Sequence, residues 1–498
     1  MVQVSMEGHN IMNWSMYNTL FQSNRFGYFL YNALSNSLIE LDEKHYRSLE
    51  EIKNAPDEEN HLIDPGFSVL LREKNILVEN GVERQLLLAR QHRRNTVCYD
   101  TSRLDLTICP TLGCNFRCLY CFEHSQNDMT VMSPSTIDRL MQFIKSFAQP
   151  KRLSVSWYGG EPTLAFGVIK EITEKLKTLD ITFENARMVT NGYLLDSEKI
   201  SQMNELKIRS VQITLDGAEA VHNTRRVHAG GQPTYQHIME RVDLLMNSDY
   251  TGSCNIRVNV DRNNAQEFLN LRAALLECYK GKKLTVYASY VHTARAHKYN
   301  DRNCQLCSQE WSDYILKLFH QQGIRPIGGF YPDIECFNTC TANSINGFVV
   351  GPKGELYKCW ADVGIPQMVI GTILEENHLT NPGLVAAYAT GTDPHLDRDC
   401  LACSTLPICG GGCANKRLRS KQLHEEGLEF CSPHKDNLIP YLEAYYDGVK
   451  TREICSNLLE HSRTKESNKG YRLIENEKKK QANHPLDNPV GNEDVVRA

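Results

Sequence analysis

The chain has 498 residues, of which 41% are hydrophobic and 23% are charged, and its formal net charge is −5 at pH 7. This balance is typical of a globular protein with ample core, and it favours neither nucleic acid nor an anionic membrane as a partner. No apolar run approaches the roughly 20 residues that span a bilayer, and MVQVSMEGHN lacks the pattern of a secretory signal, so we expect a cytoplasmic protein.

Residues 1–95 are predicted to form a small separate unit. Two apolar runs flank Ser35-Asn36-Ser37 and predict a hairpin, helical patterns follow near residues 44–53 and 65–74, and NILVENG predicts a short strand. This order of elements is winged-helix-like. Residues 87–95 are predicted to be a linker to the next unit.

Strands alternate with helical patterns from about residue 100 to 325. The candidate strands are LDLTIC, RLSVSWYGG, ARMVTNG, SVQITLDG, NIRVNVDR and LTVYASYV. These six repeats predict an α/β fold with a parallel sheet and outer helices, either a TIM-like barrel or an open (β/α)6 part of one. In such folds the chemistry lies at the carboxyl ends of the strands.

The first of these strands runs directly into CNFRCLYC, which holds Cys114, Cys118 and Cys121. The chain has 18 cysteines, and clustered cysteines in a reducing compartment indicate metal or redox chemistry more often than disulfides. Three thiolates can hold three irons of a [4Fe–4S] cluster and leave the fourth iron open. A zinc site with a distant fourth ligand and a chance grouping of cysteines are the other interpretations.

Short polar motifs end the later strands on the same rim. They are GGEPT at 159–163, TNG at 190–192, DG at 216–217 and RVNVD at 257–261. Each motif alone is an ordinary strand end or tight turn. Four such motifs on one rim beside an open cluster favour a shared binding site.

The cysteine loop, with Tyr120 between its last two cysteines, and the later Gly159-Gly160-Glu161-Pro162 resemble the radical S-adenosylmethionine (SAM) superfamily over about residues 102–325. The resemblance implies that SAM chelates the fourth iron and that an electron from a donor such as flavodoxin or ferredoxin cleaves it to a 5′-deoxyadenosyl radical. That radical abstracts a hydrogen atom from the substrate.

The resemblance also implies which strand-end residues contact SAM: Gly159, Gly160, Glu161, Thr190, Asn191, Asp216 and Asn259. Glu161 is expected near the amine of SAM, and Thr190, Asn191 and Asp216 near the ribose or carboxylate. Asn259 is a weaker candidate contact. His222, Arg225 and Arg226 resemble a family segment on the substrate side, but the start of a solvated helix fits them equally well.

Residues from about 330 to 448 are rich in cysteine, and residues 460–498 form a polar tail that we expect to be mobile. Cys340, Gly354 and Cys359 precede the run C-x2-C-x5-C-x3-C-x17-C. Taken alone, the four cysteines of C-x2-C-x5-C-x3-C are as consistent with a zinc site as with any other use. The whole arrangement resembles the SPASM extension of radical SAM enzymes, which binds two auxiliary [4Fe–4S] clusters.

The SPASM resemblance implies two sets of cysteine ligands, which would bring the total to three clusters. The first set is Cys336, Cys340, Cys359 and Cys413, and the second is Cys400, Cys403, Cys409 and Cys431. The spacing of Cys336 departs from the family pattern, and without Cys336 the first cluster has an open iron. Cys304 and Cys307 fit a local structural pair better than a redox pair.

A SPASM extension implies a polypeptide substrate, and the N-terminal unit resembles the element with which maturases of ribosomally made peptides bind a precursor's leader by strand addition. A structural cap without a ligand is the alternative for that unit. The enzyme would install a thioether or carbon–carbon crosslink, or an epimerised centre.

An anaerobic sulfatase-maturing enzyme, which makes formylglycine from Cys or Ser, is the competing interpretation. That family usually has an aspartate directly after the last cysteine of the first SPASM segment, whereas Cys359 is followed by Trp360, with Asp362 only nearby. It also generally lacks an N-terminal extension. A non-catalytic iron–sulfur or zinc scaffold would have no need for the SAM rim. The sequence therefore favours the peptide maturase.

Overall fold

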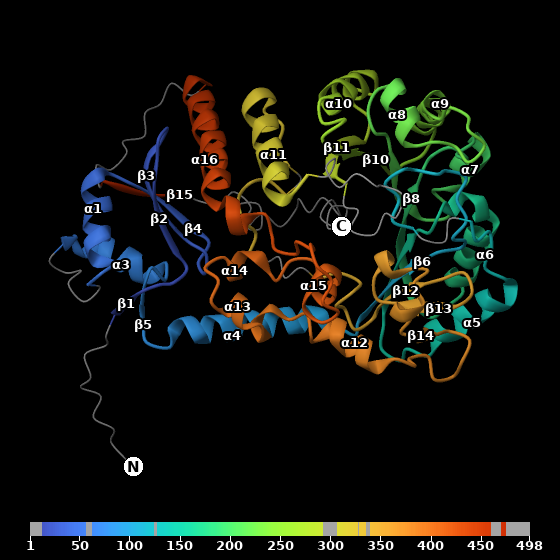
Figure 1. Ribbon diagram of the computed structural model, residues 1–498, viewed down its shortest axis with the longest axis horizontal. Helices are drawn as coiled ribbons and strands as arrows, with labels where there is room; N and C mark the ends of the chain where they lie inside the picture. Colours follow the sequence, from blue (N-terminus) through green and yellow to red (C-terminus); the bar gives the residue numbers. More distant parts are fainter. Residues whose placement is uncertain are drawn as a thin grey trace, which may run out of the picture.

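The computed structural model describes residues 12–55, 62–123, 127–291, 306–326, 328–334, 339–459 and 470–474. Within these ranges a nine-stranded mixed sheet organises the fold (Figure 1). Its parallel strands are β6 (Arg103–Ile108), β7 (Arg152–Trp157), β8 (Thr182–Thr190), β9 (Ile208–Thr214), β10 (Ser253–Val260) and β11 (Leu284–Tyr290). All six predicted strands are therefore confirmed, and they pair in chain order.

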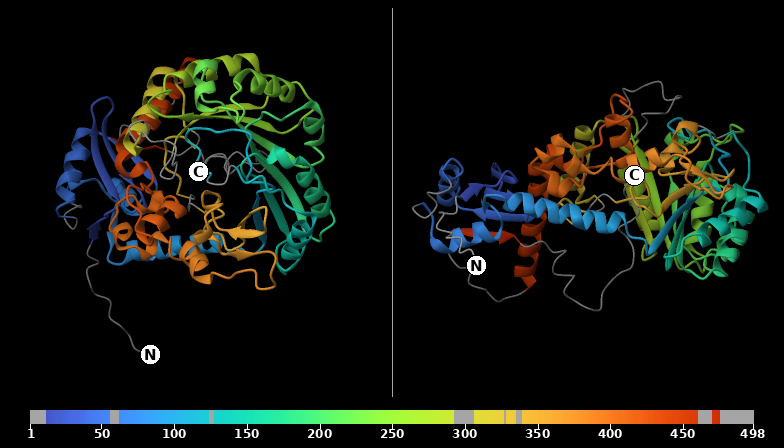
Figure 2. Two further views of the ribbon diagram at one scale, coloured as in Figure 1. Left: turned by 45° about the vertical axis from the view of Figure 1, so that its right-hand side comes forward. Right: turned by 90° about the horizontal axis from the view of Figure 1, so that it is seen from below.

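The sheet stays open because its two ends do not pair with each other. β12 (Gly347–Val350) pairs in parallel with β6, and β13 (Glu355–Tyr357) and β14 (Gly371–Thr372) follow it as antiparallel strands. β11 and β14 are the edges. Figure 2 shows that the sheet is curved, with helices along its outer side. The predicted α/β fold with a partial barrel is confirmed, with added antiparallel strands at one edge.

Helices connect the strands and cover the outer face of the curved sheet (Figure 2). They are α5 (Pro134–Lys145), η2 (Pro162–Ala165), α6 (Phe166–Lys177), α7 (Ser197–Gln202), α8 (Glu219–Arg225), α9 (Tyr235–Met246), α10 (Glu267–Cys278) and α11 (Ser308–Gln322). In α5 the Ser133 side chain accepts from the Thr136 N–H, and Ile137, Leu140 and Ile144 are buried. Capping and an apolar stripe thus define this helix.

The N-terminal unit contains the predicted hairpin, helices and strand. Its elements are β1 (Met12–Trp14), β2 (Asn18–Ser23), β3 (Gly27–Asn32), β4 (Ser37–Leu41), α1 (Glu43–Ile52), α3 (Pro65–Glu73) and β5 (Leu77–Glu79). β2, β3 and β4 form an antiparallel meander, and β1 pairs with β5. Leu30, Ile39, Leu49 and Phe67 belong to one buried cluster, so α1 and α3 share their core with the meander.

The predicted linker at 87–95 is wrong, because these residues lie within the 17-residue helix α4 (Val82–Cys98). Arg90 and Arg94 are buried on this helix. Nη2 of Arg90 donates to the Ile334 carbonyl (2.7 Å), and Nη1 of Arg94 lies 3.7 Å from Oδ2 of Asp393. The buried face of α4 carries arginines where most helices carry an apolar stripe, so hydrophobic periodicity could not predict this helix.

The C-terminal region consists of short elements followed by a long kinked helix. They are η4 (Trp360–Asp362), η5 (Pro366–Met368), α12 (Pro382–Ala389), η6 (Pro394–Leu396), α13 (Arg398–Leu401), α14 (Leu406–Cys409), α15 (Ala414–Lys421) and α16 (His434–Leu459). α16 is kinked at Asn437 and packs through Tyr446 against Phe26 and Phe29 of the N-terminal unit. None of the described helices is both long and apolar enough to cross a membrane.

The tail that we expected to be mobile contributes one strand, β15 (Tyr471–Ile474). It pairs antiparallel with β4 and completes a four-stranded sheet in the order β15-β4-β3-β2. The sequence YRLI is the short apolar exception within a polar segment, and a local pattern of four residues is too brief to predict a strand without its partner.

Candidate functional site

The three-cysteine loop leaves the carboxyl end of β6 and is held by a second segment of the chain. The N–H groups of Arg117 and Leu119 donate to the carbonyls of Val227 (2.7 Å) and Arg225 (3.1 Å). The Ala229 N–H in turn donates to the Asn115 carbonyl (2.7 Å). Backbone pairing with residues 225–229, directly after α8, therefore sets the position of the thiols.

The three thiols of this loop lie within electrostatic reach of one another. Burial raises the pKa of Cys114, and the nearby Glu161, Cys118 and Cys121 raise it further. Burial also raises the pKa of Cys118, whereas the Arg226 guanidinium lowers it. Because iron binds the thiolate form, cluster binding by this loop would release protons.

Gly159 and Gly160 lie directly against the backbone of the cysteine loop. A Cβ atom on Gly160 would be 2.2 Å from the Leu112 carbonyl oxygen, and one on Gly159, whose φ is +118°, would be 2.3 Å from that of Thr111. The Glu161 N–H donates to the Gly113 carbonyl (2.9 Å). Glycine is therefore required at both positions by the loop itself.

The buried Glu161 carboxylate joins the ends of β7 and β8. Its Oε1 accepts from the Thr163 N–H (3.0 Å) and from the hydroxyls of Thr163 (2.5 Å) and Thr190 (2.7 Å), and Oε2 accepts from the Asn191 N–H (2.6 Å). Nδ2 of Asn191 then donates to Oδ1 of Asn115 in the cysteine loop (2.7 Å). Glu161, Thr190 and Asn191 thus meet beside the loop, and their contacts with SAM stay a prediction.

Tyr120 connects the loop to the ends of β9 and β10. Its hydroxyl accepts from Nη1 of Arg226 (2.7 Å) and from Nδ2 of Asn259 (3.1 Å). The Asn259 N–H donates to Oδ1 of Asp216 (3.2 Å). Burial raises the pKa of Tyr120. All four predicted strand-end motifs therefore converge on the cysteine loop.

A solvated helix start, one of the two interpretations of residues 222–226, is wrong because His222, Arg225 and Arg226 are buried. Arg225 forms ion pairs with Asp261 (Nη1–Oδ2 2.7 Å) and Asp216 (Nε–Oδ2 3.4 Å). Burial also lowers the pKa of His222. The segment is part of the polar network at the strand ends, where charges are retained by pairing.

Two buried donors beside the loop have no hydrogen-bond partner among the described residues. They are Nδ2 of Asn115 and Nε of Arg226. Buried polar groups in native proteins are nearly always paired. A ligand that offers oxygen acceptors would satisfy both donors.

Three residues of this network were not assigned a role from the sequence: Asn115, Thr163 and Asp261. Each lies inside a motif that the sequence does reveal, namely CNFRCLYC, GGEPT and RVNVD. These motifs are the sequence signal by which the three residues could have been found. Their side-chain partners depend on which strand ends become neighbours.

A second group of thiols comes from three separate segments before β12, after β13 and before α15. Burial raises the pKa of Cys359, and Asp362, Cys413 and Cys340 raise it further. Lys358 is fully buried beside them, and its Nζ donates to the carbonyls of Ser344 (2.5 Å) and Gly347 (2.6 Å). Cys336, the fourth predicted member, lies outside the described residues.

A third group of thiols lies between α13 and α16. Burial raises the pKa of Cys409, and the thiols of Cys431 and Cys400 raise it further. Nη1 and Nη2 of Arg417 are each 3.3 Å from the Cys400 Sγ, and Nζ of Lys435 is 3.8 Å from the Cys431 Sγ. Burial raises the pKa of the Cys400 thiol, and the Arg417 guanidinium lowers it.

The remaining member of that predicted set, Cys403, has its Sγ 3.2 Å from the Thr405 hydroxyl. The chain between Cys409 and Cys413 passes very close to the segment before Cys431. A Cβ atom on Gly412, whose φ is +70°, would be 1.6 Å from the Phe430 carbonyl oxygen. Glycine at 412 therefore lets two cysteine-bearing segments meet.

Within the described ranges, no three His, Cys, Asp or Glu side chains are arranged to hold one metal ion. In a four-iron cluster each thiolate binds a different iron, so its ligands stand farther apart than those of a single ion.

Cys307 has a structural role at the beginning of α11. Its Sγ accepts from the Glu310 N–H, and the Glu310 carboxylate accepts from the Cys307 N–H (2.8 Å), which completes a capping box. Its predicted partner Cys304 lies outside the described residues. The cap agrees with a structural rather than a redox interpretation of Cys307.

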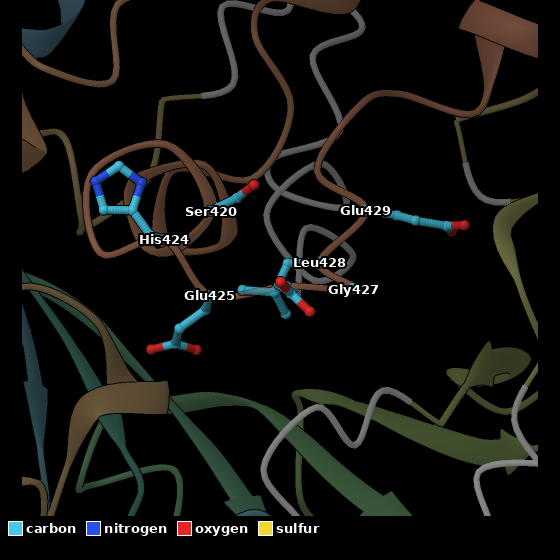
Figure 3. Close-up of a pocket in the computed structure, with 7 residues that line it drawn as sticks. Ser420, His424, Glu425, Gly427, Leu428 and Glu429 are labelled. Carbon is cyan, nitrogen blue, oxygen red and sulfur yellow. The ribbon is translucent and has the colours of Figure 1, made fainter.

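A pocket of about 490 Å³ opens in the loop that follows α15 (Figure 3). It is lined by Ser420, His424, Glu425, Glu426, Gly427, Leu428 and Glu429. Glu425 is bound by Nε of Arg419 (2.7 Å), and Glu429 accepts from the Ser308 N–H (2.9 Å) at the beginning of α11. These contacts connect the cysteine-rich region to the last helix of the α/β fold.

Comparisons with known proteins show which family model, relatives and solved structures this chain is similar to. The sequence model of the radical SAM superfamily matches residues 108–275. The cysteine-type anaerobic sulfatase-maturating enzyme of Clostridium perfringens (strain 13 / Type A) is 23% identical over 366 residues, which cover 67% of this chain and 95% of that protein. The serine-type enzyme of Bacteroides thetaiotaomicron is 21% identical over 383 residues, covering 68% and 88%.

Among solved structures, native anSMEcpe with bound AdoMet aligns with this chain at a TM-score of 0.56 and 20% identity. The alignment covers 70% of this chain and 98% of the other. At this level of identity the likeness establishes a shared fold.

We predict that Gly160→Ala displaces the cysteine loop, because its Cβ would overlap two carbonyl oxygens of that loop. The iron content after anaerobic reconstitution should fall by about four atoms per chain, the content of one cluster. Gly167→Ala in α6 is the matched control, since a Cβ there meets nothing within 4 Å. Equal iron contents in the two variants would contradict the role assigned to Gly160.

Proposed function

Because this chain carries the radical SAM domain at residues 108–275 and is a radical SAM enzyme, we propose that it modifies a ribosomally made precursor peptide. The modification is a thioether or carbon–carbon crosslink, or an epimerised centre. The observation that carries the proposal is the convergence of Cys114, Cys118 and Cys121 with the ends of four strands.

Membership of the superfamily implies one [4Fe–4S] cluster and SAM, which together supply a 5′-deoxyadenosyl radical. Cys114, Cys118 and Cys121 would hold the cluster. The unpartnered donors of Asn115 and Arg226 offer hydrogen bonds to the carboxylate of SAM. Gly159 and Gly160 hold the loop against the sheet, and the Glu161 carboxylate fixes the neighbouring strand ends.

Two auxiliary [4Fe–4S] clusters complete the proposal. Their ligands are the thiols of Cys340, Cys359, Cys413 and Cys336, and of Cys400, Cys403, Cys409 and Cys431. Support comes from the electrostatic influence of Cys340 and Cys413 on Cys359 and of Cys400 and Cys431 on Cys409, and from the cations beside Cys400 and Cys431. A flavodoxin or ferredoxin in the cytoplasm would supply electrons.

The segment after Cys359 favours a peptide maturase over formylglycine formation. Trp360 stands where an aspartate is usual, and its ring stacks on Tyr158 at a centroid distance of 5.2 Å. The nearby Asp362 is fully buried and accepts from the Tyr388 hydroxyl and from Nδ2 of Asn415 (2.9 Å). A carboxylate held in this way is not free to take a proton from a substrate.

Anaerobic sulfatase maturation is the second candidate. The observation that favours it is the match to two sulfatase-maturating enzymes over 95% and 88% of their lengths. Both candidates act on a polypeptide. They differ in the product, which mass analysis distinguishes.

We further propose that the N-terminal sheet binds the leader of the precursor. Its meander and the helices α1 and α3 form a compact module, and short elements of this kind bind peptides by adding a strand. Deleting the whole module is a poor test, because Tyr331, Leu442 and Tyr446 share a buried cluster with it. Point changes on the sheet are better suited.

Replacing Cys114, Cys118 and Cys121 together with alanine should abolish formation of 5′-deoxyadenosine, because no cluster would remain to bind SAM. Iron should fall from about 12 to about 8 atoms per chain. Cys254→Ala, a buried thiol in β10, is the matched control and should keep both properties. SAM cleavage that persists in the triple variant would show that the wrong cluster was chosen.

If the two sets of C-terminal cysteines hold separate clusters, substituting one cysteine of a set should remove the iron of that cluster alone. Cys359→Ala and Cys400→Ala should each remove about four irons, and the double variant about eight, since the two residues serve different clusters. Elemental analysis and Mössbauer spectra measure both the number and the type of cluster. A chain filled with zinc and poor in iron would contradict the assignment.

The substrate is tested with a short cysteine-bearing reading frame beside the gene. Co-reaction of its peptide with the reconstituted enzyme and SAM should give a crosslinked or epimerised product. A synthetic sulfatase peptide with Cys or Ser at the modified position is the parallel reaction. An aldehyde in the sulfatase peptide, with the precursor unchanged, would decide for the second candidate.

A further inference from the structure

One edge of the N-terminal sheet is filled by the far end of the chain. β2, β3 and β4 follow one another within residues 18–41, whereas the strand beside β4 is β15 (Figure 1). Tyr471 pairs with Leu41 and Ile474 pairs with Leu38. The tail therefore occupies this edge in the way that an added peptide strand would.

Alternate side chains of β15 face two different layers. The Tyr471 ring lies 4.4 Å from the Phe67 ring and 5.4 Å from His45, and Leu473 packs in the same cluster. On the other face, Nε of Arg472 donates to Oε2 of Glu40 (3.1 Å). The edge thus has an apolar site for an aromatic and an aliphatic residue, and a carboxylate for a basic residue between them.

The buried residues of the cluster between the meander, α1 and α3 all lie within residues 12–77, and Tyr471 and Leu473 of β15 pack against them only partly buried. The strand has four residues, of which only Ile474 is fully buried, and the Asp42 N–H donates to the carbonyl of Gly470 just before it (2.8 Å). The meander pairs within itself and shares its core with α1 and α3. Each intramolecular hydrogen bond contributes little net stability, so a similar peptide can replace so short a strand.

We propose that the outer edge of β4 is the docking edge for the polypeptide substrate and that β15 is a displaceable intramolecular occupant of it. This inference rests on the proposed function in taking the partner to be the substrate. The partner that fits is an extended antiparallel segment with an aromatic and a branched aliphatic residue two positions apart. A basic residue between them faces Glu40.

β2 is the opposite edge of the sheet, and among the described strands β3 is its one neighbour. The β4 edge is the better docking site because the structure shows a strand seated there between two layers of side chains. Tyr446 on α16 donates to Oε1 of Glu40 (2.5 Å) and so holds this carboxylate toward the arginine. The two edges are distinguished by where a bound peptide protects the backbone.

The tail itself supplies the probe. A fluorescein-labelled peptide with the sequence SNKGYRLIENEK, residues 467–478, is titrated into the reconstituted full chain and into a chain that ends at Glu466. A tethered strand competes with an effective concentration on the order of millimolar. We expect the shortened chain to bind the peptide at least about ten times more tightly, as the cis competitor is gone. Equal affinity in both chains, or no binding to the shortened chain, overturns the proposal.

A second variant keeps the full length. Ile474→Asp places a carboxylate in a buried apolar cluster and should release the strand, which gives the same gain in peptide affinity as the shortened chain. Hydrogen exchange should show protection of residues 37–41 by the bound peptide and none of residues 18–23. Protection at 18–23 instead would assign docking to the β2 edge.

Peptide variants test the recognition pattern. Peptides with Tyr471→Ala, Leu473→Ala or Arg472→Glu should bind several-fold more weakly, and Asn476→Ala is the control that should bind unchanged. The precursor identified by its modification should displace the labelled peptide. If the precursor is modified but does not compete with the labelled peptide, only the proposed docking edge is wrong. If the precursor competes but SAM is not cleaved, the docking edge stands and the proposed chemistry is wrong.

Discussion

The contact between the cysteine loop and the glycine pair at the end of β7 is the constraint on which the rest of the site depends. The backbone of residues 111–113 occupies the space that side chains at 159 and 160 would fill. From this contact the Glu161 carboxylate reaches the end of β8, and Tyr120 reaches the ends of β9 and β10. The loop and four strand ends therefore form one unit, and a shift in one moves the others.

Charge balance gives that unit its second constraint. Arg225 and Arg226 are buried beside Asp216, Asp261 and Tyr120, and desolvated charges of this kind persist only when they are paired. Arg225 is the last residue of α8 and Arg226 follows it, and the carbonyl of Arg225 accepts a hydrogen bond from the cysteine loop. Position of the thiols and pairing of the charges are thus coupled, which suits a site that must hold a polar, charged ligand away from water.

Much of this architecture could be predicted because its signals are local. The six parallel strands are short runs rich in apolar and β-branched residues, and each is followed by a turn or a helical pattern. α4 was missed because Arg90 and Arg94 provide its buried face, and β15 was missed because YRLI stands in a polar segment. For His222 and its neighbours the sequence left burial and exposure equally open, and only the ion pairs with strand ends resolved them.

The sequence by itself determined the chemistry: three thiols within one short loop must lie near one another, and the glycines, carboxylate and amides at the strand ends are named by their motifs. Tertiary structure decided the partners. Which C-terminal thiols group together, which segment pins the cysteine loop, and which strand borders β4 depend on contacts between residues far apart in the chain. Spacing constrains only neighbours in sequence, whereas these contacts follow from how the sheets and helices pack.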